Sequence, residues 1–451
     1  MIESHATELP ATRPAAKPVV SRRDEDVALR RAACALGGML SIVLLVGVGS
    51  FAVLGSVPHG GFDPPGVVDH LGAVRDALAA PFARWDSVWY LTIARHGYTP
   101  GPSPAFFPLY PLLVAALGAL GPGLLVGGVL ISVAAMLVGL RLLWLLTDLE
   151  LGAAHPDAAD LAVFAVALGP MAFFFTAVYS ESLYLALTLG AFLSARQERW
   201  ARAGVLGALA AATRSSGLLV IVGLLGLWLE QRRPESRWAR WPAGRVPGRP
   251  APPPAGGRPA AHPGRRRDLL WIAVVPLGLL AYLCALALGG LPPLAPFSSQ
   301  QEWFRHFTGP VGGVLEGARA AFAGARQLLS GQTRTVYYPL AGGDPMTAGW
   351  HNVMLFGFLV GCVPLVVGAL RRLPLAYGLY ALSATCLAIS YPVSPQPLTS
   401  LPRYLVVLFP LPMTLGLWLA RHPRLRLPVL GASAVSLAGF TELFATWHWI
   451  A

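Results

Sequence analysis

The chain is short of charge and of cysteine, and each shortage excludes a class of protein. Only 12% of its 451 residues are charged and 55% are hydrophobic, whereas soluble domains carry about a quarter charged residues. Its four cysteines fall inside apolar runs without the spacing of metal ligands. This excludes a disulfide framework and favours buried thiols. The composition therefore predicts an integral membrane protein, and the arginine-rich bias, with Lys17 as the only lysine, indicates a GC-rich bacterial genome.

Apolar runs divide the rest of the chain into membrane segments. Residues 1–32 are polar and basic, so we expect a disordered tail. The run 33–57 exceeds the ~7–15 residues of a signal-peptide core and predicts a retained first span. Further helices are expected near 124–147, 159–178, 182–195, 203–214, 217–230, 269–289, 351–370, 374–391, 404–420 and 427–447. The predicted fold is an all-α, polytopic bundle over 33–451 with about eleven spans.

The distribution of basic residues predicts the orientation of this bundle. If the run 105–120 does not span, 25 of the 34 Lys and Arg residues lie on one side and the remaining nine on the other. The positive-inside rule places the richer side in the cytoplasm. We therefore expect a bacterial plasma-membrane protein with a cytoplasmic N-terminus, an external C-terminus and a re-entrant 105–120.

Three segments outside the spans differ in composition. Residues 231–267 are rich in Pro, Gly and Arg and predict a disordered cytoplasmic loop. This loop either anchors the topology or binds anionic lipid headgroups; in neither case does its charge point to nucleic acid. Residues 58–105 and 290–350 are expected outside, with amphipathic stretches at 71–82 and 318–330 suited to the membrane interface.

The first external loop contains an isolated acid among aromatic residues. In the segment RWDSVWYLTIARHGY, residues 84–98, Asp86 is the only acid. A carboxylate in such surroundings is a candidate general base, and aromatic faces bind sugar rings. Alternatively, Asp86 is the N-cap of a helix in an interfacial aromatic belt.

Three more ionisable residues are expected near the same side of the membrane. Glu181 in AVYSESLYL, Arg214 in AATRSSGLL and Arg403 in TSLPRYLVV lie at the ends of apolar runs. Two guanidinium groups near a carboxylate suit a substrate that carries a phosphate, because arginine binds phosphate oxygens through a rigid fork of donors. The alternative is a structural ion pair, or side chains that reach to the interface.

Together these motifs resemble the PIG-V family, the mannosyltransferases that add the second mannose to GPI anchors in eukaryotes. The matching segments are WDSVWYLTIARHGY, AFFPLYPLL, FTAVYSESLY, ATRSSGL and PRYL, in that order. The resemblance implies a GT-C fold, a polyprenyl-phosphate sugar donor and a lipid or glycan acceptor, with Asp86 at the catalytic position. It also implies phosphate recognition by Arg214 and Arg403. The sugar and acceptor site is then expected to include Trp85, Trp89, Tyr90, His96, Tyr98, Tyr179, Glu181 and Tyr404.

Other functions remain open from the sequence. The spans and buried charges also suit a transporter or flippase of lipid-linked glycans, a non-catalytic scaffold, or a GT-C enzyme for another sugar. No His/Cys/Asp cluster has metal-ligand spacing, so no metal is predicted, although Asp86 and Glu181 together could hold a divalent cation.

Overall fold

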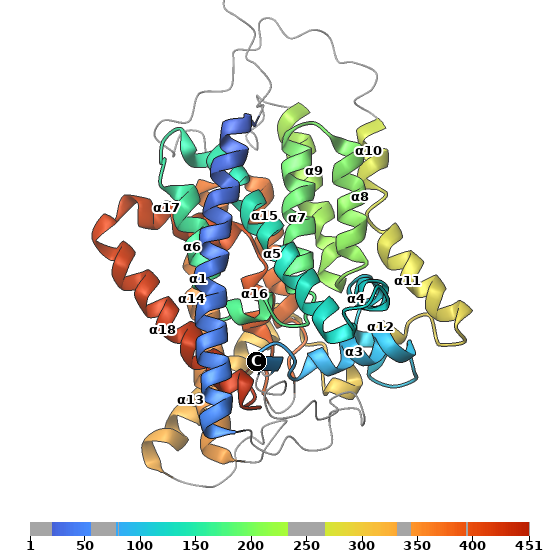
Figure 1. Cartoon of the computed structure of the whole chain (residues 1–451), viewed down its shortest axis with the longest axis vertical. Coiled ribbons are helices and arrows are strands. Elements are labelled where there is room, and N and C mark those ends of the chain that lie inside the picture. The colour runs from blue at the N-terminus through green and yellow to red at the C-terminus, as the bar shows by residue number, and fades with distance from the viewer. Residues whose placement is uncertain are drawn as a thin grey trace, which may run out of the picture.

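The computed structural model describes residues 20–55, 78–79, 81–232, 267–331, 344–393 and 396–450. These residues form helices and no strand. The β-type pairing among them is an isolated bridge between Arg305 and Val393. The prediction of an all-α fold is therefore confirmed. In Figure 1 most helices run along the long axis of the molecule, and α3 lies across it.

The connections between the helices differ in length. In chain order they are α1 (Arg22–Leu54), α3 (Asp86–His96), α4 (Leu109–Ala119), α5 (Leu124–Thr147), α6 (Ala158–Ala167), α7 (Glu181–Arg196), α8 (Trp200–Ala211), α9 (Val220–Arg232), α10 (Arg267–Ile272), α11 (Leu277–Leu288), α12 (Ala295–Ser298), α13 (Gly309–Ser330), α14 (Pro345–Arg372), α15 (Leu375–Ile389), α16 (Leu401–Val406), α17 (Pro410–Arg421) and α18 (Pro423–Ala445). Shorter turns of helix are η2 (Ser103–Ala105), η3 (Asp148–Gly152), η4 (Ala172–Phe175), η5 (Ser215–Leu219) and η7 (Gln301–Trp303).

Several of these helices are long and apolar enough to cross a membrane. Within the described residues there are five, namely Arg22–Leu54, Leu124–Gly152, Arg267–Leu288, Pro345–Arg372 and Pro423–Ala445. Shorter apolar helices pack between them. The polytopic character is thus confirmed, while the number of about eleven spans stays a prediction.

The first helix begins earlier than the sequence led us to expect. The disordered tail was placed at 1–32, but α1 starts at Arg22. Ser21 and Asp24 form a reciprocal capping box, with Asp24 N–H donating to Ser21 Oγ at 3.1 Å and Ser21 N–H to Asp24 Oδ2 at 3.0 Å. Such a box satisfies backbone donors that otherwise lack partners. Ala28 and Ala32 are fully buried, so packing also holds this turn of the helix.

The doubtful run 105–120 forms a short helix. α4 has 11 residues, which corresponds to about 16 Å of length, against a hydrocarbon core of about 30 Å. It packs against α5. A helix this short does not cross the membrane unaided, which favours the non-spanning assignment.

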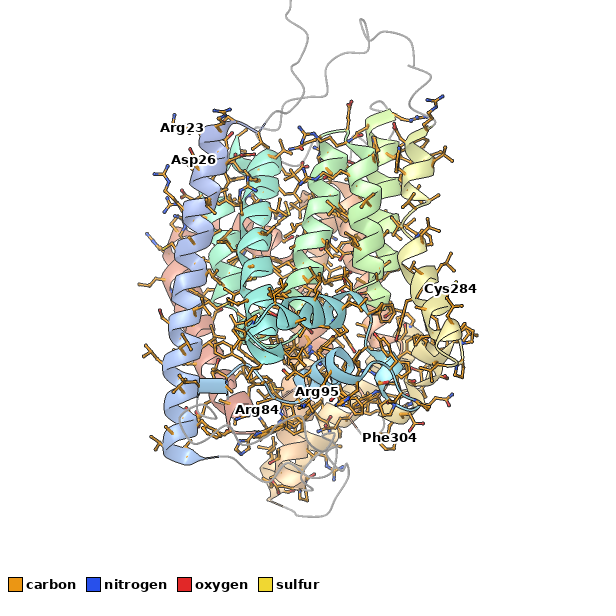
Figure 2. The ribbon with its side chains drawn as sticks, turned by 45° about the vertical axis from the view of Figure 1, so that its right-hand side comes forward. Arg23, Asp26, Arg84, Arg95, Cys284 and Phe304 are labelled. Carbon is orange, nitrogen blue, oxygen red and sulfur yellow. The ribbon has the colours of Figure 1, made fainter. Side chains whose placement is uncertain are left out.

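Three of the arginines assigned to the cytoplasmic side form ion pairs at one end of the bundle. The pairs are Arg31–Asp160 (3.1 Å), Arg141–Glu25 (3.4 Å) and Arg426–Asp157 (2.8 Å). Figure 2 shows Arg23 and Asp26 at this end, with Arg84 and Arg95 toward the opposite end. The start of α1 and the motif at 84–98 therefore lie at opposite ends, as the predicted topology requires.

The helices α12 and α13 lie at the end of the bundle that carries the motif at 84–98 (Figure 1). α13 contains the amphipathic stretch expected at 318–330, and its glycines pack against neighbouring helices. A Cβ on Gly313 would overlap the Ile389 carbonyl oxygen, and one on Gly324 would lie 2.5 Å from the Gly349 carbonyl oxygen. Large apolar side chains on α13 remain exposed: Val311, Leu315, Phe322 and Leu329. Most of the segments 71–82 and 231–267, for which an interfacial helix and a disordered loop were predicted, lies outside the described residues.

Candidate active site

Asp86 is the first residue of α3, which crosses the end of the bundle. The N-cap position belongs to Trp85, whose φ of 54° is unusual for a non-glycine residue and whose side chain makes no capping bond. The Asp86 carboxylate instead forms an ion pair with Arg403 Nη1. Asp86 is therefore not the helix N-cap that the alternative interpretation proposed, and its side chain points toward α16.

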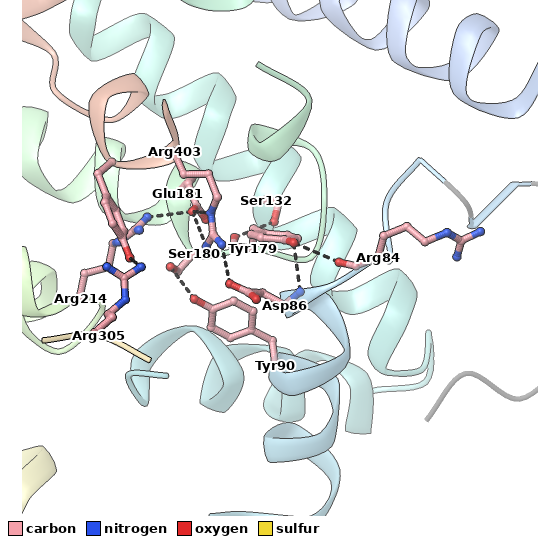
Figure 3. Close-up of polar contacts among 11 residues, drawn as sticks. Arg84, Asp86, Tyr90, Ser132, Tyr179, Ser180, Glu181, Arg214, Arg305 and Arg403 are labelled. Atoms are coloured by element: carbon pink, nitrogen blue, oxygen red, sulfur yellow. Dashed lines mark hydrogen bonds and ion pairs between the residues drawn. The ribbon is translucent and has the colours of Figure 1, made fainter. Parts of the chain in front are cut away.

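Two arginines converge on the buried carboxylate of Glu181. This residue begins α7 and is completely buried. Its Oε1 lies 2.9 Å from Arg214 Nη1 and 3.0 Å from both Nε and Nη2 of Arg403. A buried carboxylate requires such partners, because an unpaired charge away from water is costly. Arg403 thus bridges Glu181 and Asp86, and the two acids and two arginines form one network (Figure 3).

Tyr179 connects this network to the backbone before α3. Its hydroxyl accepts a hydrogen bond from Asp86 N–H at 3.1 Å and donates one to the Arg84 carbonyl oxygen at 3.0 Å. The Arg403 guanidinium carbon lies 4.7 Å from the centre of the Tyr179 ring, within the range of a cation–π contact. Tyr179 therefore fixes Asp86 and Arg403 relative to each other.

Tyr90 lies one helical turn beyond Asp86. Its hydroxyl is 2.9 Å from Ser180 Oγ, next to Glu181 in the chain. Burial, followed by the negative charge of Glu181, raises the pKa of the Tyr90 phenol. The phenol therefore stays neutral and serves as a hydrogen-bonding group rather than as a base.

A cavity of about 500 Å³ opens beside this network. One part of its wall is polar and aromatic, with Asp86, Arg214, Arg403, Tyr404, Trp85, Trp89, Tyr90, Trp303, Arg305 and Trp449. Another part is apolar, with Leu218, Leu219, Leu387, Ala388, Val407 and Leu408. Leu218 and Leu219 end η5, Leu387 and Ala388 lie in the last turn of α15, and Val407 and Leu408 follow α16. The cavity can thus accept a molecule with a polar head and an apolar tail.

Most of the site residues predicted from the sequence gather here. Trp85, Asp86, Trp89, Tyr90, Arg214, Arg403 and Tyr404 line the cavity, and Tyr179 and Glu181 contact those that do. His96 and Tyr98 do not line it. His96 is exposed at the far end of α3, and the Tyr98 hydroxyl donates to the Phe106 carbonyl oxygen at 2.8 Å. This hydrogen bond assigns Tyr98 to the packing of the loop, and burial there raises the pKa of its phenol.

The wall residues that the sequence did not single out include Trp303, Arg305 and Trp449. Trp303 contacts Trp89 edge-on at a ring distance of 6.0 Å, and Trp449 contacts Trp85 in the same manner at 5.0 Å. A signal did exist. The runs EWFRHF at 302–307 and TWHWI at 446–450 combine aromatic and basic residues outside the apolar runs, as the motif at 84–98 does.

The divalent cation considered for Asp86 and Glu181 does not fit this arrangement. The guanidinium of Arg403 contacts both carboxylates, so a cation already holds the position between them. Within the part of the chain that the structure describes, no three His, Cys, Asp or Glu side chains are grouped to hold a metal ion. No step below uses a metal.

The fold and the cavity define the class of this protein, a multi-pass helical membrane protein with a charged and aromatic site at one end. Residues 57–230 match the family model described as Mannosyltransferase (PIG-V). The resemblance to PIG-V proteins is therefore confirmed over that segment, which contains Asp86, Tyr179, Glu181 and Arg214. Arg403 and Arg305 lie beyond it.

Individual relatives match the same part of the chain. The rat protein GPI alpha-1,6-mannosyltransferase 2 is 37% identical over 173 residues, covering 36% of this chain and 34% of the relative. The human protein of that name is 36% identical over 170 residues, with the same coverage. The chain thus matches about a third of the length of these curated relatives. Among solved structures, the oligosaccharyltransferase AglB from Archaeoglobus fulgidus aligns over 91% of this chain and 56% of its own, with 13% identity and a TM-score of 0.36.

Proposed function

We propose that this chain is a membrane glycosyltransferase that moves mannose from a polyprenyl-phosphate donor to a lipid- or glycan-linked acceptor on the outer face of the membrane. The match to mannosyltransferases over 57–230 supports the reaction class. The observation that carries the proposal is the placement of Asp86. It lies in the wall of the cavity and pairs with Arg403, which also holds Glu181.

In the proposed reaction, Asp86 acts as the general base. It accepts the proton of the acceptor hydroxyl while that oxygen attacks C1 of the sugar. The bond between C1 and the phosphate oxygen breaks, and the polyprenyl phosphate leaves with the electron pair. Because attack and departure occur on opposite faces, this single displacement inverts the anomeric centre. The ion pair with Arg403 orients the carboxylate before the acceptor arrives.

The apolar wall of the cavity suits the lipid of such a donor. Isoprenoid chains are apolar, and Leu218, Leu219, Leu387 and Val407 line the same cavity as Asp86. Leu218 and Leu219 belong to the expected membrane helix at 217–230, and Val407 to the one at 404–420. The aromatic side chains near Asp86 would then contact the sugar.

The decisive measurement is transfer of labelled mannose from polyprenyl-phosphate mannose in membranes. For Asp86→Asn we expect turnover to fall by ~10²–10⁴-fold, because the variant keeps the shape of the side chain but cannot accept the proton. The matched control is Asp157→Asn, the same change at an exposed position at the opposite end of the bundle; it should keep native activity.

Three outcomes bear on the proposal. Near-native activity of Asp86→Asn, at equal protein levels, would remove Asp86 from the role of base. Transfer of another polyprenyl-linked sugar in place of mannose would keep the reaction and change the donor. Movement of a lipid-linked glycan across the membrane without any new glycosidic bond would replace the proposal with transport.

A further inference from the structure

Arg214 and Arg403 are already occupied by carboxylates. Glu181 contacts both of them, and Asp86 pairs with Arg403. These four residues contribute two negative and two positive charges, so their network is neutral as a whole. The two arginines that the motifs pointed to as phosphate ligands are therefore engaged in holding the two acids in place.

Arg305 is a third arginine in the wall of the same cavity. Its Nη2 donates to the Tyr404 hydroxyl at 3.1 Å, and its Nη1 donates to the Tyr391 carbonyl oxygen at 3.2 Å. Both partners are neutral. Among the residues that the structure describes, no carboxylate forms an ion pair with Arg305. It therefore adds one positive charge that the site itself does not neutralise.

Arg305 lies on the far side of the network from Asp86. The guanidinium carbons of Arg305 and Arg214 lie 5.6 and 5.2 Å from the centre of the Tyr404 ring. Figure 3 shows Arg214 and Arg305 together on one side of Glu181, with Asp86 on the other. A phosphate bound at Arg305 would thus lie apart from Asp86, the proposed base. A sugar ring attached to that phosphate would then lie in the cavity between Arg305 and Asp86.

The backbone around Arg305 is held firmly at this place. Arg305 N–H donates to the Gln300 carbonyl oxygen at 3.1 Å, and Arg305 bridges to Val393. Next along the chain, His306 N–H donates to the Pro392 carbonyl oxygen at 3.1 Å. The segment therefore pairs with the connection that follows α15, and the guanidinium is presented to the cavity by a fixed backbone.

From this geometry we infer that Arg305 binds the phosphate of the donor and makes an anionic, lipid-linked donor a requirement of the site. The inference rests on the function proposed above. A sugar linked to a lipid through one phosphate is a phosphodiester with a single negative charge, which matches the single surplus charge of Arg305. Its fork of N–H donors, extended by the Tyr404 hydroxyl, suits two phosphate oxygens.

The test compares native protein with Arg305→Gln in two measurements, binding of a short isoprenyl phosphate to purified protein and the donor KM in the transfer assay. We expect the dissociation constant for isoprenyl phosphate and the donor KM both to rise by ~10–100-fold. A loss of this size follows from the loss of a hydrogen bond to a charged group. The acceptor KM should stay native. Arg319→Gln removes an exposed arginine of α13 that does not line the cavity, so it should leave both constants unchanged.

The outcomes separate this inference from the proposed function. Native isoprenyl-phosphate affinity and donor KM in Arg305→Gln, in protein that transfers mannose, would overturn the role of Arg305 and leave the function intact. Phosphate binding that depends on Arg305 in protein that transfers no sugar would support Arg305 and overturn the function. If native protein neither binds the phosphate nor transfers sugar, both fail.

A second variant covers the case in which the glutamine protein does not fold. Arg305→Lys keeps the charge and loses the fork, so we expect the affinity for isoprenyl phosphate to fall about three- to tenfold. Binding of the uncharged isoprenol should not change. Unaltered phosphate affinity in this variant would also overturn the assignment.

Discussion

At the scale of single residues, the site is arranged around one buried carboxylate. Glu181 is completely buried and holds Arg214 and Arg403 through a single oxygen, Oε1. Arg403 in turn reaches Asp86. The position of the proposed base therefore depends on a residue that does not itself line the cavity, and a change at Glu181 would affect folding and activity together.

We expect Glu181→Gln to destabilise the protein by about 3 kcal/mol, because it leaves two nearly buried arginines with one carboxylate between them. Heat- or detergent-induced unfolding of the purified protein measures this effect. Glu302→Gln is the matched control, since Glu302 is exposed beside the cavity. Equal stability of the two variants would contradict the structural importance of the Glu181 pairs.

At the scale of elements, close helix packing positions the segment that carries Arg305. This segment leads directly into α13, and Gly313 in the second turn of α13 lies against the carbonyl oxygen of Ile389 at the end of α15. The same end of α15 accepts a hydrogen bond from Thr308 N–H through the Ser390 carbonyl oxygen, at 3.0 Å. The absence of a side chain at Gly313 thus sets the distance between Arg305 and the rest of the site.

Gly313→Ala should therefore push α13 away from α15, lower the stability by about 1–3 kcal/mol and weaken donor use. The apparent unfolding temperature and the donor KM report the two effects. Gly439→Ala in α18 is the comparison, because a Cβ there has no atom within 4 Å and alanine is the better helix former. A Gly313→Ala protein with native stability and donor KM would disprove the close contact.

At the scale of the whole molecule, charge and chemistry lie at opposite ends. Ion pairs such as Arg31–Asp160 and Arg426–Asp157 lie at one end, and Arg84 and Arg95, on either side of Asp86 in the chain, lie toward the other (Figure 2). The positive-inside rule predicts that the basic end lies in the cytoplasm, so we expect the cavity at the outer face.

Labelling of single cysteines in intact cells tests this orientation. In a background without native cysteines, His96→Cys should react with a membrane-impermeant maleimide added outside, and Asp157→Cys should react only after the membrane is permeabilised. Both positions are exposed. The reverse pattern would place the proposed active site on the inner face and require a donor presented there.

The sequence by itself determined the membrane character, the helical class and the four charged residues of the network. Hydrophobic runs and the asymmetry of arginines are summed along the chain, so they can be read without coordinates. Glu181, Arg214 and Arg403 were found in this way, because charged side chains beside apolar runs need a specific reason. Asp86 was found as the only acid of an aromatic segment in the first external loop.

Only the tertiary structure decided how these residues are paired. The sequence could not reveal that Glu181 and Asp86 occupy Arg214 and Arg403, because their partners lie 222 and 317 positions apart in two of these contacts. For the same reason the sequence gave no role to Arg305 or Trp449. It placed His96 and Tyr98 in the sugar and acceptor site only because they share the motif at 84–98 with Asp86. Proximity along a helix such as α3 does not imply a common face, since successive residues point in different directions around its axis.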